Sequence, residues 1–229
     1  MMKISRRAGL MLAAAQGALL ALGVRVAWAD SSVGQLSKKE NDVWGTLKGA
    51  AQIALNESAQ IFRNQKLETG EHSAAVVKFI DDSQLSLGAH ANTVIDEYVY
   101  DGDKSHSSVM LAKGAFRFVS GQMPEKNMKL NTPTVGIGIR GTELKIDVYD
   151  DGSTEMSTIE GAASVTSIAT REVLEVIAGH SILADAKGLF IGGVRDFIHK
   201  SADNAIERGL DELRSRSPIP LPDIPNPFR

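Results

Sequence analysis

Three glycines in the middle of the chain, Gly136, Gly138 and Gly141, have the G-x-G-x-x-G spacing of a turn that binds a dinucleotide cofactor. In such a turn a strand precedes the glycines and a helix begins at the last one, so that the helix N-terminus faces the pyrophosphate. After Gly141, polar and apolar residues alternate from Glu143 to Tyr149, which is the pattern of a half-buried strand. The segment therefore predicts no dinucleotide site, and we expect no cofactor.

The same segment predicts a corner between two strands. Apolar residues stand at odd positions before Arg140 and at even positions after Thr142, and alternate residues of a strand face opposite ways, so the switch requires a bulge or a bend. Gly136 and Gly138 share a face with Arg140, which leaves a bare slot beside one cation. Two interpretations stay open: close backbone packing, with Arg140 holding carbonyl groups at the corner, or a groove for an anion or another ligand. The candidate ligand- or partner-binding residues are Gly136, Gly138, Arg140, Gly141 and Thr142.

Other residue patterns that could support catalysis are incomplete. Gly179, His180 and Ser181 begin like the turn that carries a hydrolase nucleophile, but Leu183 stands where the closing glycine is needed. We therefore expect no catalytic residues and no enzyme activity.

Metal-binding patterns are incomplete as well. A stretch starting at Asp101 resembles the beginning of a calcium loop, yet its twelfth position is Ala112 instead of a bidentate glutamate. The five histidines are scattered without ligand spacing. No metal site is expected.

The N-terminus has the three parts of a secretory signal peptide. Lys3, Arg6 and Arg7 precede an uncharged stretch that ends at Val24, and the small-x-small pattern that closes at Ala29 predicts cleavage there. The stretch is short for a membrane span, so residues 1–29 are expected to be removed, leaving no transmembrane span and a periplasmic or secreted protein. The alternative is an uncleaved membrane anchor. Removal of four cations takes the formal net charge from −3 to −7, which argues against nucleic acid as a partner.

Short strands separated by turn residues fill the region from 30 to 187, which predicts a mainly β domain with a multi-stranded roll or sandwich architecture. A charged-Gly-Ala pattern recurs at 48–50, 113–115 and 160–162, and we interpret it as a feature of strand entry. The expected strands are 74–80, 84–87, 93–100, 109–113, 116–119, 128–131, 135–139, 144–149, 156–159, 164–168, 172–177 and 181–184.

The pattern changes near the C-terminus. Apolar residues recur at helical spacing from Leu189 to Arg214, which predicts one amphipathic helix within 188–216, packed on the β domain or exposed to a partner. Five of the seven prolines lie in residues 217–229, so this tail is expected to be extended, either solvated or bound to a partner.

Several ordered blocks of the sequence resemble the FecR family of periplasmic regulators. The T-P-x-x-x-G-I-R-G-T segment that starts at Thr132 resembles the family signature, and the block from Lys113 to Gly121 resembles its KGAFRFVSG block. The segments 94–101 and 67–79 are similar in looser form, and the resemblance is strongest from 60 to 165.

The resemblance implies a FecR-type β domain that works as a non-catalytic binding or regulatory module in envelope signalling or sensing. A full FecR regulator also has a cytoplasmic anti-sigma segment, and only Met1 to Arg7 precede the apolar stretch here. The expected partner is therefore an envelope protein, either a transporter or a membrane regulator, or a small ligand. The alternative is a structural or adaptor protein of the envelope with no signalling role.

Overall fold

The computed structural model describes residues 32–124 and 127–192, and within them the protein is mainly β, as predicted. The expected signal peptide, most of the expected C-terminal helix and the proline-rich tail lie outside the described residues. The strands are β1 (Gly34–Glu40), β2 (Val43–Leu47), β3 (Ile53–Ala54), β4 (Gln60–Ile61), β5 (Gln65–Thr69), β6 (Ala74–Phe79), β7 (Gln84–Leu87), β8 (Asn92–Val99), β9 (His106–Val119), β10 (Met128–Asn131), β11 (Val135–Val148), β12 (Thr154–Ser167), β13 (Val173–Ile177), β14 (Ser181–Asp185) and β15 (Gly188–Gly192).

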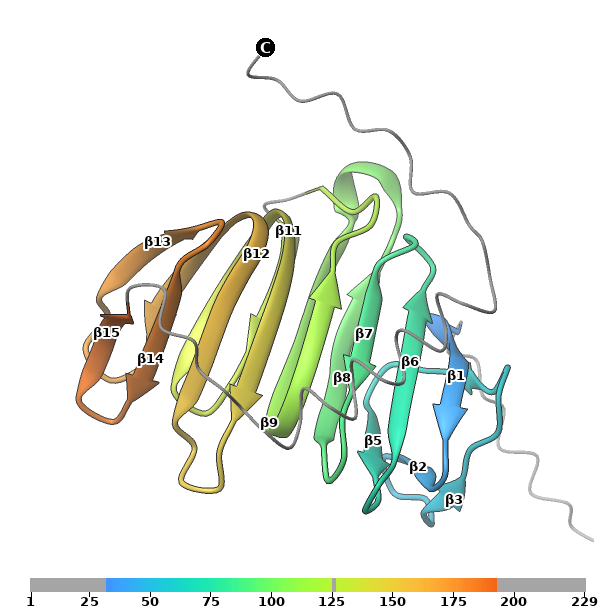
Figure 1. Cartoon of the computed structure of the whole chain (residues 1–229). Helices are drawn as coiled ribbons and strands as arrows, with labels where there is room; N and C mark the ends of the chain where they lie inside the picture. The colour runs from blue at the N-terminus through green and yellow to red at the C-terminus, as the bar shows by residue number, and fades with distance from the viewer. Residues whose placement is uncertain (1–31, 125–126, 193–229) are drawn as a thin grey trace, which may run out of the picture.

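All these strands belong to one open mixed sheet, in place of the two separate sheets of a sandwich. Figure 1 shows β1 beside β6, followed by β7, β9, β11, β12, β14 and β15, and each of these strands pairs with the next. β9 and β10 are parallel, and the other pairs in the described residues are antiparallel. A short 3-10 helix, η1 (Gly102–Lys104), connects β8 to β9, and no helix in the described residues has the length and apolar character of a membrane span.

The sheet forms two layers because three long strands bend at their middle. The first half of β9 pairs with β8 and β10, the first half of β11 pairs with β10, and the last part of β12 pairs with β13. The second half of β9 pairs with β7 and with the second half of β11, and the first part of β12 pairs with β14. We call the ladder that contains β7 and β14 the first layer and the ladder that contains β8, β10 and β13 the second layer. Each long strand thus contributes one half to each layer.

A glycine with positive φ stands at each bend: Gly114 (φ 108°), Gly141 (φ 54°) and Gly161 (φ 71°). The parity of the buried residues switches at all three positions, so that the apolar side chains of both halves face the interior. The predicted corner after Arg140 is therefore confirmed. The charged-Gly-Ala pattern at 113–115 and 160–162 marks two further corners inside strands, and its interpretation as strand entry was wrong.

Within residues 32–124 and 127–192, the two layers enclose one hydrophobic core. Phe79 of β6, in the first layer, stacks on Tyr98 of β8, in the second, with ring centroids 4.4 Å apart. Other fully buried side chains come from both layers, among them Leu36, Ile61, Leu67, Leu85, Leu87, Ile95, Leu111, Phe116, Phe118, Leu130, Ile137 and Ile139.

The prediction that a C-terminal helix begins near residue 188 is wrong. Residues 188–192 form strand β15, which pairs with β14 from Asp185 opposite Gly188 to Ser181 opposite Gly192. The side-chain carboxylate of Asp185 accepts a hydrogen bond from the backbone N–H of Lys187 at 2.6 Å, which stabilises the tight turn between the two strands. The β sheet thus continues beyond 187, the expected boundary.

Candidate functional site

The predicted glycine slot lies on the outer surface of the second layer. Val135, Ile137 and Ile139 of β11 are buried, which places Gly136 and Gly138 on the opposite face of the strand. A Cβ atom added to Gly136 would lie 3.6 Å from its nearest neighbour and one added to Gly138 would lie 3.7 Å away, which are ordinary contact distances. The slot is therefore open, and the interpretation as close backbone packing is wrong for these two glycines.

Small and polar residues of the neighbouring strands border the slot. In register, Gly138 lies between Lys129 of β10 and Ser164 of β12, and the next row places Gly136 beside Thr166. We call this surface the slot face and define it by Lys129, Asn131, Gly136, Gly138, Arg140, Ser164 and Thr166. Because two positions lack side chains, backbone atoms of β11 are accessible to a bound molecule.

Arg140 forms an ion pair across the surface. Its Nη1 lies 3.1 Å from Oε1 of Glu175 on β13, and the two side chains are 57% and 55% exposed. The pair spans β12 beside Ala162, which is small enough to let the arginine pass. The proposed role of Arg140 in holding carbonyl groups is therefore wrong, and a pair this exposed contributes about 1 kcal/mol at most.

Lys129 gives the slot face a second cation. It is exposed, stands directly opposite Gly138, and has no ion-pair partner within residues 32–124 and 127–192. One paired and one unpaired cation therefore flank an open strip of backbone, and this arrangement suits an acidic or carbonyl-rich ligand better than a cationic one.

The other two predicted site residues do not belong to this surface. Gly141 forms the corner, where a Cβ on the adjacent Gly161 would lie 2.0 Å from its carbonyl oxygen. Thr142 is buried: its hydroxyl donates to the carbonyl of Glu160, and its N–H donates to Oγ of Ser120 at 2.9 Å. Both residues hold the bend of β11 in place, so the structure divides the predicted site into a surface part and a structural part.

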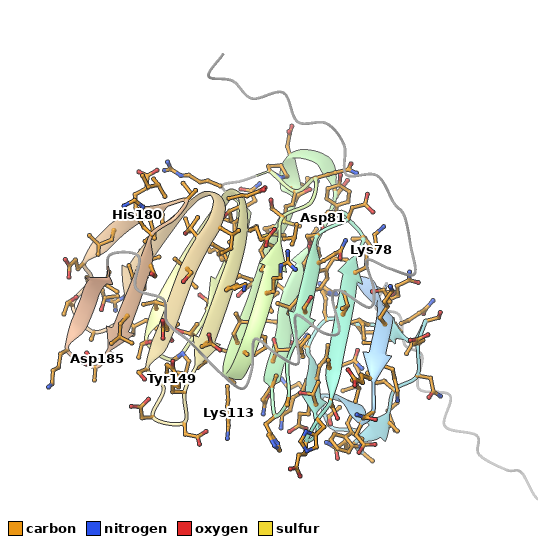
Figure 2. All side chains as sticks on the ribbon, in the orientation of Figure 1. Lys78, Asp81, Lys113, Tyr149, His180 and Asp185 are labelled. Atoms are coloured by element: carbon orange, nitrogen blue, oxygen red, sulfur yellow. The ribbon has the colours of Figure 1, made fainter. Side chains whose placement is uncertain are left out.

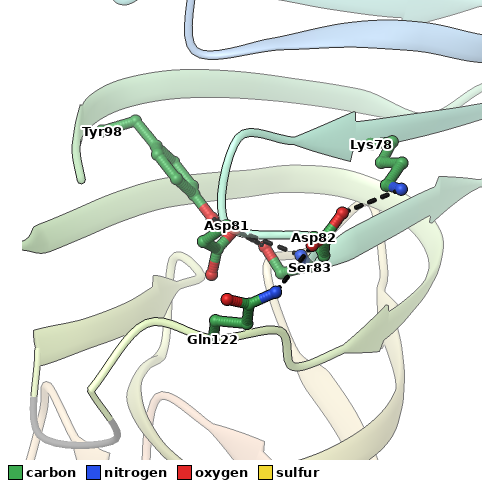
Figure 3. A network of polar contacts seen from close by, with 6 residues as sticks. All are labelled: Lys78, Asp81, Asp82, Ser83, Tyr98 and Gln122. Atoms are coloured by element: carbon green, nitrogen blue, oxygen red, sulfur yellow. Dashed lines mark hydrogen bonds and ion pairs between the residues drawn. The ribbon is translucent and has the colours of Figure 1, made fainter.

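One buried polar network was not predicted from the sequence. Asp81, in the turn between β6 and β7, is 1% exposed, and its Oδ1 accepts hydrogen bonds from the Tyr98 hydroxyl at 2.6 Å and the Ser83 hydroxyl at 2.7 Å. The N–H groups of Ser83 and Met123 donate to its two oxygens at 3.1 and 3.2 Å. Figure 3 shows Tyr98 and Ser83 directed toward this carboxylate. The network joins the β6–β7 turn to β8 and to the loop after β9.

This network is structural. Its carboxylate is satisfied by four donors and shielded from solvent, so a substrate has no access to it. Burial, followed by the bond to Asp81, raises the pKa of Tyr98 far above its usual value. The neighbouring Asp82 lies at the surface, where its contact with Lys78 lowers the pKa of its carboxyl. The Asx-turn pattern of 81–83 was the available signal in the sequence; nothing there pointed to Tyr98.

The labelled side chains of Figure 2 define two ends of the molecule. Lys78 and Asp81 lie near one end of the strands, and Lys113 and Tyr149 lie near the opposite end. We call them the Asp81 end and the Lys113 end. Within the described residues, no group of three or more histidine, aspartate or glutamate side chains converges as a metal site.

Comparison with solved structures gives a partial likeness. Two crystal structures, at 1.65 and 2.50 Å resolution, of a candidate anti-sigma factor from Parabacteroides distasonis ATCC 8503 align with a TM-score of 0.47 and 14% sequence identity. The aligned region covers 56% of this chain and 59% of that protein. No curated protein sequence matches the chain.

A family model covers the region that holds both the slot and the corners. The model described as FecR protein matches residues 65–164, nearly the stretch in which the sequence blocks resembled that family. Gly136, Gly138, Arg140 and the three corner glycines all lie inside it. The chain therefore contains a FecR domain, from β5 to the second half of β12.

Proposed function

We propose that this protein is an exported, non-catalytic FecR-type module that binds an envelope protein through the slot face and takes part in envelope signalling. The match of residues 65–164 to the FecR model carries this proposal, because it includes the open strip of β11. A regulatory role is what this family membership suggests. The partner is a transporter or a membrane regulator that presents an acidic or carbonyl-rich segment to Lys129 and the exposed backbone of β11.

The geometry of the slot face supports contact with a protein segment. The surface is open, and its centre consists of Gly136, Gly138 and the short side chain of Ser164. A partner backbone can approach such a strip closely, because no side chain keeps it away. Lys129 and Arg140 at its borders add electrostatic attraction, which speeds association more than it strengthens the complex.

In-cell crosslinking followed by capture of the tagged full-length chain from the envelope fraction tests this proposal. Mass spectrometry should identify a transporter or membrane regulator with the wild-type protein and a strongly reduced amount with Gly138→Leu, which fills the slot. Thermal unfolding of Gly138→Leu checks that the variant is folded, which we expect because an added Cβ has room at this position. Capture of the same partner in equal amount by a folded Gly138→Leu would exclude the slot face, and capture of this chain alone would exclude the signalling role.

Export is tested separately. The charged start, the apolar stretch and the pattern ending at Ala29 support cleavage after this residue. N-terminal sequencing of protein from the periplasmic or secreted fraction should therefore begin at Asp30. A full-length N-terminus in the cytosolic fraction would contradict the export proposal.

A further inference from the structure

A cleft on the outer side of the second layer shares no residue with the slot face. One of its lining residues is Lys113, which Figure 2 places at the Lys113 end of the molecule. The cleft is open and has a volume of about 330 Å³, at the lower limit of the volumes typical of ligand pockets, ~300–1,000 Å³. Residues of β2, β5, β8 and β9 and of the connecting turns line it: Trp44, Gln52, Glu68, Thr69, His90, Ala91, Asn92 and Lys113.

Trp44 provides the aromatic surface of the cleft. Its neighbours Val43 and Gly45 are buried, so the alternation of β2 places the indole on the outer face. Gly70 lies against the ring: a Cβ added there would stand 3.2 Å from Cη2 of Trp44, so a side chain at this position would press on the ring. The indole N–H has no hydrogen-bond partner in the described part of the chain.

Side chains with planar polar groups share the lining of the cleft with this ring. Nε2 of Gln52 donates to Oε2 of Glu68 at 2.8 Å, which holds both side chains over the cleft. The side-chain amide of Asn92 and the imidazole of His90 make no hydrogen bond to any described residue, although both belong to the lining. The cleft thus combines an aromatic surface with donors and acceptors that are free for a ligand.

The charges in the cleft are compensated by the protein itself. Oε1 of Glu68 lies 2.7 Å from Nζ of Lys66, and Nζ of Lys113 lies 2.5 Å from Oδ1 of Asp150. A charged ligand would have to compete with these partners. The lining therefore favours a neutral ligand with many hydroxyl groups over an anion or a cation.

We propose that this cleft binds a saccharide. A sugar ring presents a face of C–H groups, which packs against an aromatic side chain, and an edge of hydroxyl groups, each of which both donates and accepts hydrogen bonds. Trp44 meets the first requirement, while Gln52, Glu68, Asn92 and His90 meet the second. This site is separate from the slot face, and the inference does not depend on the proposed function.

Intrinsic fluorescence is the direct test, because Trp44 lines the cleft and the chain has one other tryptophan, Trp28. In a Trp28→Phe background, Trp44 is the sole reporter. Titration with β-1,4-linked hexamers of N-acetylglucosamine and of glucose should change its emission in a saturable way. Preference for the N-acetylated hexamer, together with co-sedimentation with purified cell-wall sacculi, would identify the cell-wall glycan as the source. Equal binding of both hexamers without co-sedimentation would identify free oligosaccharide.

Variants of the free polar groups sharpen the test. Asn92→Ala removes a side chain that makes no hydrogen bond to the described residues, so it should weaken saccharide binding at least tenfold without lowering stability. Thr46→Ala, an outward-facing neighbour on β2 outside the cleft, is the matched control and should leave binding unchanged. Absence of a saturable change with either hexamer would overturn the proposal. So would a response to inorganic phosphate alone, or binding that Asn92→Ala does not affect.

Discussion

Two pairs of glycines near Arg140 have opposite surroundings. A Cβ on Gly136 or Gly138 would make only ordinary contacts, at 3.6 and 3.7 Å, whereas Gly141 and Gly161 meet at the corner so closely that a Cβ on Gly161 would lie 2.0 Å from the carbonyl oxygen of Gly141. The first pair leaves the sheet surface bare, and the second lets β11 and β12 cross between the layers. One glycine spacing in the sequence thus combines an accessible surface with a structural bend.

The largest expected effect is at the corner. Gly161→Ala places a side chain on a residue with φ 71° and against a backbone carbonyl, so neither strain nor contact can relax without moving β11. We expect a loss of about 3 kcal/mol or more in the free energy of unfolding, measured by urea denaturation. The matched control is Gly138→Ala, which should change stability by less than about 1 kcal/mol because its Cβ has room. Similar losses for both variants would remove the distinction between the pairs.

The buried network at the Asp81 end ranks next. Asp81→Ala leaves the hydroxyls of Tyr98 and Ser83 without their acceptor in the interior, so we expect a loss of about 2–4 kcal/mol in chemical denaturation. Asp82→Ala is the control, because its contacts with Lys78 and Gln122 lie at the surface, where solvent screens them, so this variant should cost much less stability. If Asp81→Ala cost no more than this control, the network would not join the two layers energetically.

Alkaline pH tests the same network through Tyr98. Its pKa is raised in the folded protein, mainly by burial, whereas a tyrosine in the unfolded chain ionises near pH ~10. The corresponding stability is therefore complete below that pH and falls as the pH rises above it. The difference in unfolding free energy between wild type and Tyr98→Phe should shrink between pH 8 and pH 11, values chosen to bracket ~10. A constant difference would show that Tyr98 is not shielded.

The smallest expected effect on stability is at Arg140. Because its ion pair with Glu175 is more than half exposed, Arg140→Ala should lower the unfolding free energy by no more than about 1 kcal/mol. The melting temperature should stay close to that of the wild type, while capture of the envelope partner should decrease. A large fall in melting temperature would instead place Arg140 among the structural residues of the corner.

Much of the fold could be predicted from local patterns. The strands from β6 to β14 and the corner after Arg140 followed from alternation, because a side chain that faces the core must be apolar. Strands β1 to β5 were not assigned individually, since β3 and β4 are only two residues long and β1 ends in three charged residues. The long strands β9, β11 and β12 were each divided in two at the corner glycines, because a positive φ can be adopted in a turn as well as inside a bent strand.

The candidate site was predicted less completely, because it depends on pairing between distant segments. The slot glycines were identified, but Lys129, Ser164 and Thr166 join them only through the register of β10 and β12. Glu175 reaches Arg140 from 35 residues away in sequence, and Tyr98 reaches Asp81 from 17 residues away. Local periodicity contains no information on such partners, so neither the ion pair nor the buried network could be anticipated.

The most direct test of the central claim, that the slot face binds the partner, compares two positions on the same strand. Thr166 and Ser157 both face outward on β12, but Thr166 lies in the slot face and Ser157 in the first layer. With a photo-crosslinking residue at each position in turn, the account predicts an envelope-protein adduct from 166 and none from 157. Adducts of equal yield from both positions, or from 157 alone, would contradict it.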